Sequence, residues 1–275
     1  MTLSTIRNNP AKQKKVKTKK QKAIAATCAV AFWLLVWHVV SLCVGSELVL
    51  VSPVKVVQTL FTVIFDPDFL KTVWYSAARI LGGFFTALTF GTVLGWVASR
   101  FWVVETLLRP ITAVIKATPV ASFIILVLLW FSGKNLSVII SMLMVFPVIY
   151  MNVLEGIRSA DEKLLEMAQV FRLSVGKKLL YIYLPAVAPF FVSACSVSLG
   201  LCWKSGIAAE VIGTPDGSIG AVFYQAKIFL QTSELLAWTV VVVAVSVAFE
   251  KLFMFLLRLV LKKLKMEDVL NGKRA

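Results

Sequence analysis

Long apolar runs separated by short polar segments dominate this sequence. Several runs reach the roughly 20 residues that an α-helix needs to cross a hydrocarbon layer about 30 Å thick. The runs cover residues 23–44, 74–98, 111–131, 136–154, 182–203 and beyond, and 235–257. This pattern predicts an all-α, polytopic membrane protein with about six transmembrane helices.

The composition points the same way. The chain has 275 residues, 59% of them hydrophobic, and a mean hydropathy of +0.86, which is too apolar for a soluble domain. The first run, residues 23–44, could be a secretory signal peptide. It is longer than the usual apolar region, however, and no clear small-residue cleavage site follows it. We therefore expect a retained first transmembrane helix.

Positive charge is concentrated near the two ends of the chain. The formal net charge is +15, and residues 1–22 contain eight Lys or Arg side chains and no acid. A basic tail that leads directly into a span more often sets topology or contacts anionic lipid than binds nucleic acid, so we expect no nucleic-acid partner. With this tail in the cytoplasm, six spans place the basic C-terminal segment 261–275 there as well.

Charges in the loops agree with this orientation. The segments that it places inside contain Arg100, Arg109, Arg158, Lys163, Arg172, Lys177 and Lys178. The outside segments contain only the scattered residues Lys55, Lys71, Lys134, Lys204 and Lys227. Such a bias is typical of a membrane protein with its positive loops in the cytoplasm.

The expected organisation has five parts: a basic cytoplasmic tail at 1–22, a first transmembrane helix at 23–44, an extracytoplasmic connector at 45–71, a membrane core at 72–260 and a cytoplasmic C-terminus at 261–275. The connector resembles a short amphipathic segment, and its sequence Asp66-Pro67-Asp68 indicates a turn before the second span.

Small side chains recur every four residues in the second span. They are Gly83, Ala87, Gly91, Gly95 and Ser99. This spacing places them along one stripe of a helix, and in lipid such a stripe lets two helix backbones approach closely. We expect this span to be tightly packed against another helix.

Two prolines interrupt the third span, in Arg109-Pro110 and in Thr118-Pro119. Proline removes a backbone donor and kinks a helix, so the freed carbonyl groups need partners. We expect this helix to pack against protein or to line a cavity. Lys116 is either a pathway residue or, as we favour, an interfacial charge close to the cytoplasmic end.

A polar, basic and helix-prone segment, residues 166–185, separates the fourth and fifth spans. Ser159 and Glu162 fit a capping box that opens a helix near Ala160. Apolar residues then recur at three- and four-residue spacing, at Leu164, Met167 or Ala168, and Phe171.

Ser174 can cap a second short helix, and Pro185 is expected to interrupt the return into the membrane. Two short helices over about 160–181 would form a knob that fits a groove on a cytoplasmic partner. The alternative is a solvated loop that only joins two spans.

Candidate catalytic chemistry is missing from the sequence. The four cysteines have no metal-ligand spacing, and the single histidine provides no catalytic constellation, so we expect no metal and no cofactor. The chain also has no GxxxxGK[ST] phosphate loop and cannot hydrolyse ATP by that route. We therefore expect that it is not an enzyme.

The polar segment resembles the cytoplasmic signature of the permeases of binding-protein-dependent ABC importers: Glu-Ala-Ala, three residues, Gly, nine residues, Ile, one residue, Leu-Pro. This chain matches the register with Glu166, Met167, Ala168, Arg172, Ile182, Leu184 and Pro185. Met167 replaces an alanine, and Arg172 replaces the glycine thought to mark the turn between the two coupling helices. Gly176 is a candidate to relieve that turn instead.

The resemblance covers roughly residues 50–260 and is strongest to the nitrate, sulfonate and taurine branch of these permeases. The supporting segments lie at 50–53, 76–84, 129–133, 146–147 and 203–213. Vitamin-precursor permeases of the same family are similar and remain an alternative.

This resemblance implies a permease subunit of a bacterial inner-membrane importer. Such a subunit works as a pair, usually a homodimer, binds two cytoplasmic ABC ATPase subunits and receives solute from an extracytoplasmic binding protein. On the family pattern, the signature residues form the element that couples the ATPase to the pathway. ATP hydrolysis is then expected in the separate partner subunit.

Three residues of the fifth span are candidates for the solute path: Trp203, Lys204 and Glu210. Ionisable residues at membrane depth are functional candidates, and an ammonium group near the outer mouth would suit a small anion such as a sulfonate. Alternatively, Lys204 and Glu210 neutralise one another or lie in the headgroup region.

Two other functional classes compete with the permease. A secondary transporter driven by an ion gradient would also be polytopic, but it would be expected to show an internal repeat with paired broken helices, and no convincing repeat is visible. A scaffold that transports nothing is the third possibility. ATP-dependent uptake separates the permease from both.

Overall fold

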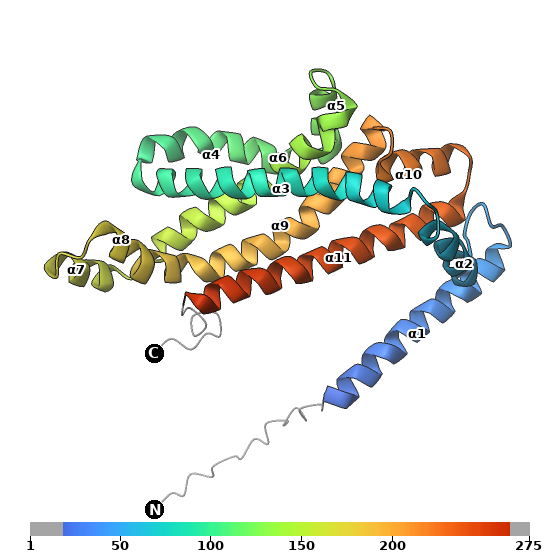
Figure 1. Ribbon diagram of the computed structural model, residues 1–275, viewed down its shortest axis with the longest axis horizontal. Helices are drawn as coiled ribbons and strands as arrows, with labels where there is room; N and C mark the ends of the chain where they lie inside the picture. Colours follow the sequence, from blue (N-terminus) through green and yellow to red (C-terminus); the bar gives the residue numbers. More distant parts are fainter. Residues whose placement is uncertain (1–18, 265–275) are drawn as a thin grey trace, which may run out of the picture. The chain divides into compact units, whose positions relative to one another are not determined.

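The structure is a computed structural model, and it describes residues 19–264. The predicted tail at 1–22 and C-terminal segment at 261–275 therefore lie mostly outside the described residues. The chain divides into two compact units, Met1–Lys55 and Val56–Ala275. The first contains α1 (Lys19–Val44), and the second contains nearly all the other elements (Figure 1).

The second unit is built from helices of very different lengths. In chain order they are α2 (Pro53–Ile64), which begins just before the unit boundary, α3 (Phe69–Arg100), α4 (Trp102–Ala117), α5 (Val120–Leu128), α6 (Gly133–Arg158), α7 (Glu162–Val170), α8 (Val175–Lys178), the π-helical turn η1 (Leu179–Tyr183), α9 (Leu184–Gly213), α10 (Ile219–Ile228) and α11 (Thr232–Lys263). No strand occurs within residues 19–264.

The all-α, polytopic fold is confirmed. Five described helices are long and apolar enough to cross a membrane, and α8, η1 and α9 count together as one of them, Val175–Gly213. A sixth span results if α4 and α5 are taken as one broken helix. The prediction of about six spans therefore depends on how this pair is placed in the bilayer.

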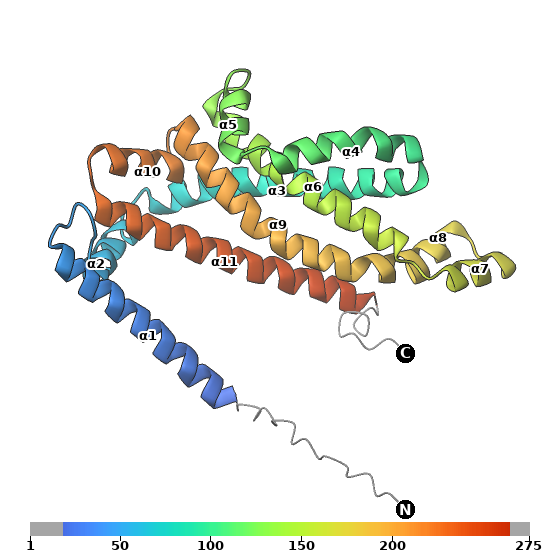
Figure 2. The ribbon, with the colours of Figure 1, turned by 180° about the vertical axis from the view of Figure 1, so that it is seen from behind.

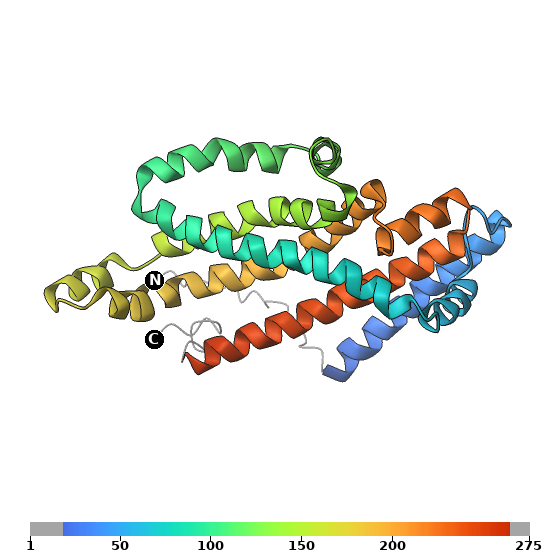
Figure 3. The ribbon, with the colours of Figure 1, turned by 45° about the horizontal axis from the view of Figure 1, so that its top comes forward.

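The pair α4 and α5 corrects the prediction of one kinked helix at 111–131. The chain stays helical through Pro110 and breaks only at Pro119, where α4 and α5 form an angle of 106°. Thr118 has the extended conformation (φ −82°, ψ 134°) that a following proline favours. In Figure 3, α5 is seen end-on while α4 is seen from the side.

The core of the second unit lies between α3, α6 and α9, and α11 packs against α9 (Figures 1 and 2). Its largest fully buried side chains include Ile80 and Phe84 of α3, Ile149 of α6, and Leu199 of α9. Because these side chains come from three different spans, they hold the helices together through close packing.

The small-residue stripe of α3 faces α6. A Cβ atom at Gly83 would lie 2.4 Å from the carbonyl oxygen of Val138, and one at Gly95 would lie 3.0 Å from that of Tyr150. Gly91 approaches the side chain of Ile149 to 3.0 Å in the same way, and Ala87 is fully buried. Larger side chains at these glycines would push the two backbones apart.

The fifth span is longer than predicted and is not broken at Pro185. It runs from Val175 to Gly213, and the π-helical turn η1 lies just before that proline. A π-helical turn shifts the hydrogen-bond pattern by one residue, so the chain passes the missing N–H group without ending the helix.

The two ends of the second unit are chemically different. The turn between α3 and α4, the helices α7 and α8, and the last turns of α11 lie at one end, whereas α5 and α10 lie at the other (Figures 1 and 3). Basic residues close the helices that finish at the former end: Arg100 in α3, Arg158 in α6, and Lys263 in α11. This end carries α7 and α8, which contain part of the predicted coupling element.

Candidate coupling surface and pathway residues

We call α7, the turn after it and the short helix α8 the coupling segment, after the role that the family resemblance implies for it. Asp161 caps α7, because its Oδ1 atom accepts a hydrogen bond from the backbone N–H of Lys163 at 2.9 Å. The predicted capping box at Ser159 and Glu162 is wrong. Ser159 instead ends α6, where its hydroxyl donates to the carbonyl of Gly156 at 2.8 Å.

Arg172 itself makes the turn between the two short helices. Its φ is +47°, in the left-handed region that glycine adopts most easily. The N–H of Leu173 donates to the carbonyl of Ala168 and that of Arg172 to the carbonyl of Gln169, both at 3.0 Å. These two bonds define a Schellman motif, in which the left-handed residue follows the helix cap.

Gly176 does not relieve this turn. It lies inside α8, where its φ is not in the left-handed region, whereas Arg172 carries the strained conformation. Arg172 therefore preserves the turn at the signature glycine position. Ser174 stands at the cap position of α8, as expected, although its side chain makes no capping hydrogen bond.

The signature residues divide into an internal and an external group. Ala168 is fully buried and packs in one cluster with Ile182 and Ala160. A larger side chain at 168 would have to displace its neighbours in this cluster. Leu184 and Pro185, which open α9, are half-buried and lead this cluster into the fifth span.

Exposed apolar residues beside the signature positions form an apolar tip. Val170 and Phe171 at the end of α7 are 79% and 70% exposed, and Val175 at the start of α8 is 79% exposed. Met167 and Leu164 are exposed to a lesser degree, and Glu166 lies beside them on the surface. The apolar face expected along α7 is thus split, since Ala168 points inward while Phe171 points outward.

Glu210 is buried within the core. Its Oε2 atom accepts a hydrogen bond of 2.6 Å from the Ser76 hydroxyl and one of 3.3 Å from the backbone N–H of Gly220. The same serine oxygen accepts from the N–H of Ile219 at 2.9 Å. Glu210 and Ser76 together therefore satisfy the first N–H groups of α10, where a carboxylate also suits the helix dipole.

Lys204 and Glu210 do not form a pair. Lys204 is exposed and lines a cavity of about 430 Å³ between α9 and α11, together with Gly200, Trp203 and Thr239. Trp203 is only 2% exposed, and its ring belongs to the core. The three candidate pathway residues therefore lie in different environments: Glu210 inside, Trp203 in the core, and Lys204 on the surface.

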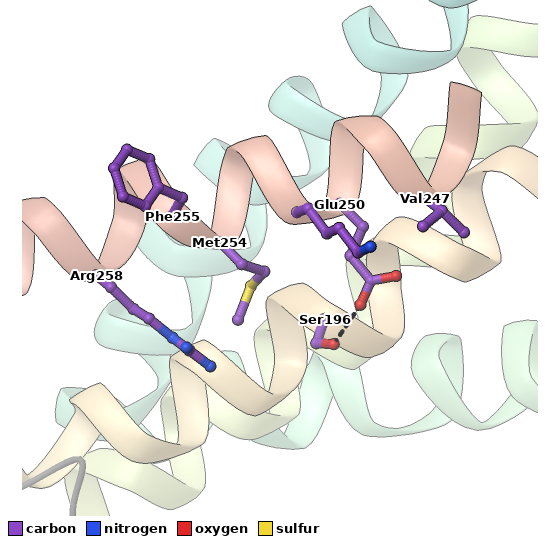
Figure 4. Close-up of a pocket in the computed structure, with 7 residues that line it drawn as sticks. Ser196, Val247, Glu250, Met254, Phe255 and Arg258 are labelled. Carbon is purple, nitrogen blue, oxygen red and sulfur yellow. Dashed lines mark hydrogen bonds between the residues drawn. The ribbon is translucent and has the colours of Figure 1, made fainter. Parts of the chain in front are cut away.

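A second cavity between α9 and α11, lined partly by charged side chains, was not anticipated from the sequence. It measures about 370 Å³ and is lined by Ser196 of α9 and by Glu250, Lys251, Met254 and Arg258 of α11. The Ser196 hydroxyl donates to Glu250 Oε1 at 2.8 Å, and Figure 4 shows both side chains pointing into the space between the helices. The sequence did contain one indication of this cavity, since Glu250 and Lys251 are charged residues within the apolar run 235–257.

Within 19–264, no group of three or more His, Cys, Asp or Glu side chains could hold a metal ion. Cys195 and Cys202 are buried free thiols, and Cys28 and Cys43 are exposed ones.

Comparisons with known proteins agree with this arrangement. TauC of Escherichia coli, named as a taurine transport system permease protein, is 27% identical over 78% of this chain and 80% of its own length. SsuC of Bacillus subtilis, whose name refers to aliphatic sulfonates, is 29% identical over 78% of each chain. NrtB of Synechocystis, named as a nitrate import permease protein, is 25% identical over 74% and 76%.

A solved structure supports the fold. A chain from the crystal structure of an amino acid ABC transporter with histidines has a TM-score of 0.50 and 16% identity, over 70% of this chain and 96% of that one. The profile of the family described as binding-protein-dependent transport system inner membrane component matches residues 87–266, which include the whole coupling segment. The chain therefore belongs to the inner-membrane permease family of binding-protein-dependent transport systems.

Proposed function

We propose that this chain forms the translocation path of an ABC importer for a small anion and is driven by a separate ATPase that docks on α7 and α8. The observation that carries the proposal is the apolar tip of Val170, Phe171 and Val175. Three large apolar side chains exposed on a capped, well-packed turn fit the groove of a protein partner.

The internal packing of the same segment supports its mechanical role. Ala168 and Leu173 bind the α7 side of the segment to Ile182, and Ile182 leads directly into Leu184 and the 30-residue helix α9. A push on α7 is therefore transmitted to a membrane span through packed side chains. Such a segment can bias a two-state pathway when its partner changes shape.

The names of the relatives support an anionic solute. Taurine carries a sulfonate group, and nitrate is also an oxyanion. A binding protein would deliver the solute from outside the membrane, and a second permease subunit, in the simplest case another copy of this chain, would complete the path. Basic helix ends beside α7 and α8 favour a cytoplasmic location for that end of the molecule.

Reconstituted uptake tests the proposal. The tagged permease is purified from its native membrane with whatever subunits accompany it, and uptake of labelled taurine, nitrate and bicarbonate into proteoliposomes is measured with the purified binding protein. We expect accumulation of one of these anions only when ATP is present on the side of α7 and α8. Accumulation driven by a proton or sodium gradient without ATP would identify a secondary transporter and contradict the proposal.

A further inference from the structure

Two basic residues on one face of α4 line a cavity between α4 and α6. The cavity measures about 450 Å³ and is bounded by Arg109, Thr112, Ala113, Lys116, Ala117 and Met151. Arg109, Ala113, Lys116 and Ala117 recur at three- and four-residue spacing, so one helix face presents two cations separated by small side chains. Both cations are exposed.

Lys116 lies beside the middle part of α6 rather than at its end. The ammonium group of Lys116 is 3.4 Å from the sulfur of Met151. Met151 lies about 10 Å along α6 from its last residue, Arg158, at a rise of 1.5 Å per residue. Lys116 thus lies about two turns of α6 from that end, and its assignment to the interface or to the pathway stays a prediction.

An acidic residue near the N-terminus of α4 is paired with a basic one, whereas Arg109 and Lys116, later in the same helix, have no acidic partner among the described residues. At the start of α4, Glu105 forms an ion pair with Arg158 of α6. Beyond this pair, no carboxylate in the described part of the chain lies within 4.0 Å of the basic groups of Arg109 or Lys116. Two cations without acidic partners create a positive potential in this cavity.

The backbone at this place also indicates contact with water or protein. α4 ends at Ala117, and the 106° break at Thr118 and Pro119 interrupts its hydrogen-bond ladder directly after Lys116. A broken helix at membrane depth is tolerated only where it is buried in protein or lines a water-filled cavity. The C-terminal dipole of α4 accounts for one cation in its last turn, but it does not account for Arg109 two turns earlier.

We propose that Arg109 and Lys116 form a transit site for a small oxyanion of the sulfonate or nitrate type on the translocation path. Arginine can bind two oxygens of such a group at once, and lysine supplies a compact second charge. The small side chains of Ala113 and Ala117 leave room for the anion between the two cations. This inference rests on the proposed function, because it assigns a site to the anion that the importer carries.

Thiol modification tests the site without knowledge of the transported solute. Cys28 and Cys43 are first replaced by serine, and Ala113→Cys or Ala117→Cys is introduced into the full transporter in membranes. The two probes are the anionic 2-sulfonatoethyl methanethiosulfonate and the cationic 2-(trimethylammonio)ethyl methanethiosulfonate. Each rate, measured by mass spectrometry of the permease, is divided by the rate for free 2-mercaptoethanol.

We expect both introduced cysteines to react faster with the anionic probe, and we expect the ratio of the two rates to fall at least about tenfold in the double variant Arg109→Gln, Lys116→Gln. Val114→Cys is the matched control, because Val114 is 59% exposed but does not line the cavity, so its ratio of rates should not change in the glutamine variants. The parent protein, which has no introduced cysteine, is treated with the same probes, and any modification of its remaining Cys195 and Cys202 is subtracted.

Two results would overturn the transit site. Equal normalised rates for the two probes, unchanged by the glutamine variants, would show that the cations do not attract anions. Resistance of the Ala113→Cys and Ala117→Cys variants alike to both probes would show that this face of α4 contacts lipid. Neither result depends on ATP-driven uptake, so failure of the transit site and failure of the proposed importer are distinguishable.

Discussion

At the scale of single residues, Arg172 shows how a sequence can depart from a family signature without changing the turn. The signature glycine marks a left-handed position, and Arg172 adopts that conformation with φ +47°. A non-glycine residue in this region costs roughly 1–2 kcal/mol. The hydrogen bonds of the Schellman motif and the packing of Leu173 against Ala168 offset this cost.

Substitutions at Arg172 should therefore follow an unusual order. We expect Arg172→Gly to raise the free energy of unfolding by a few tenths to about 1 kcal/mol, and Arg172→Val to lower it by about 1 kcal/mol or more. Thermal midpoints of the purified permease in detergent measure the effect. At the helical position Gln169 the order should reverse, with glycine the worse substitution, and the same order at both positions would contradict the assignment of the turn.

Glu210 is a second residue whose role follows from its contacts. Its carboxylate and the hydroxyl of Ser76 hold the start of α10 through a chain of hydrogen bonds. Ser76→Ala leaves both the carboxylate and the N–H of Ile219 without this partner, so we expect a loss of about 1–3 kcal/mol in the free energy of unfolding. Thermal unfolding of the variant gives the sign and size.

The control for this substitution is on the same helix. Ser99 donates only to the carbonyl of Trp96 in its own helix, so Ser99→Ala should change stability by less than about 0.5 kcal/mol. Equal effects of the two serine substitutions would show that the network around Glu210 contributes nothing.

At the scale of elements, some boundaries could be predicted and others could not. Apolar length identifies the spans because the bilayer fixes how many residues a helix needs. The difference between Pro110 and Pro119 could not be read from the sequence, since both follow the same rule for proline. The capping of α7 by Asp161 was also missed, because Ser159 matches the capping pattern but is still part of the preceding helix end.

The contact between α3 and α6 gives the clearest test at this scale, because the chain contains two adjacent glycines with opposite surroundings. A Cβ atom at Gly83 would lie 2.4 Å from a backbone oxygen of α6, whereas one at Gly82 would meet nothing within 4 Å. We expect Gly83→Ala to lower the free energy of unfolding by about 1–3 kcal/mol. Gly82→Ala should be neutral or stabilise the helix by up to about 1 kcal/mol.

Unfolding of the two alanine variants in a series of detergent and denaturant mixtures compares them directly. If Gly83→Ala is as stable as Gly82→Ala, then α3 and α6 do not approach at this stripe. The small-residue spacing alone predicts a packed face, but it does not name the partner helix, because every other span is also a possible neighbour.

At the scale of the whole molecule, the internal and external halves of the coupling segment suggest how the permease is driven. Ala168 and Ile182 tie the segment to α9, and the exposed apolar tip at its outer side remains available to a partner. The family signature could identify this segment from the sequence. It could not show which signature residues point inward, because that depends on how α7 packs against η1.

The pathway residues were the least predictable part. Their charge within an apolar run made Lys204 and Glu210 candidates for the pathway. Only the structure shows that Glu210 is a buried cap of α10 and that Lys204 is exposed. The acid at Glu250 and the cavity beside Arg109 and Lys116 lie on helices whose facing partners are not evident from a single sequence.

Co-purification of the ATPase with tip variants tests the central claim most directly. The tagged permease is isolated from native membranes, and the amount of a P-loop ATPase bound per permease is determined by quantitative mass spectrometry. We expect a stoichiometric ATPase with the unaltered chain and with the control Gln169→Asp, which adds a charge on an exposed polar position of α7. Phe171→Asp combined with Val175→Asp should reduce the bound ATPase at least about tenfold while the permease stays folded. Full retention of the ATPase by this double variant would contradict the account.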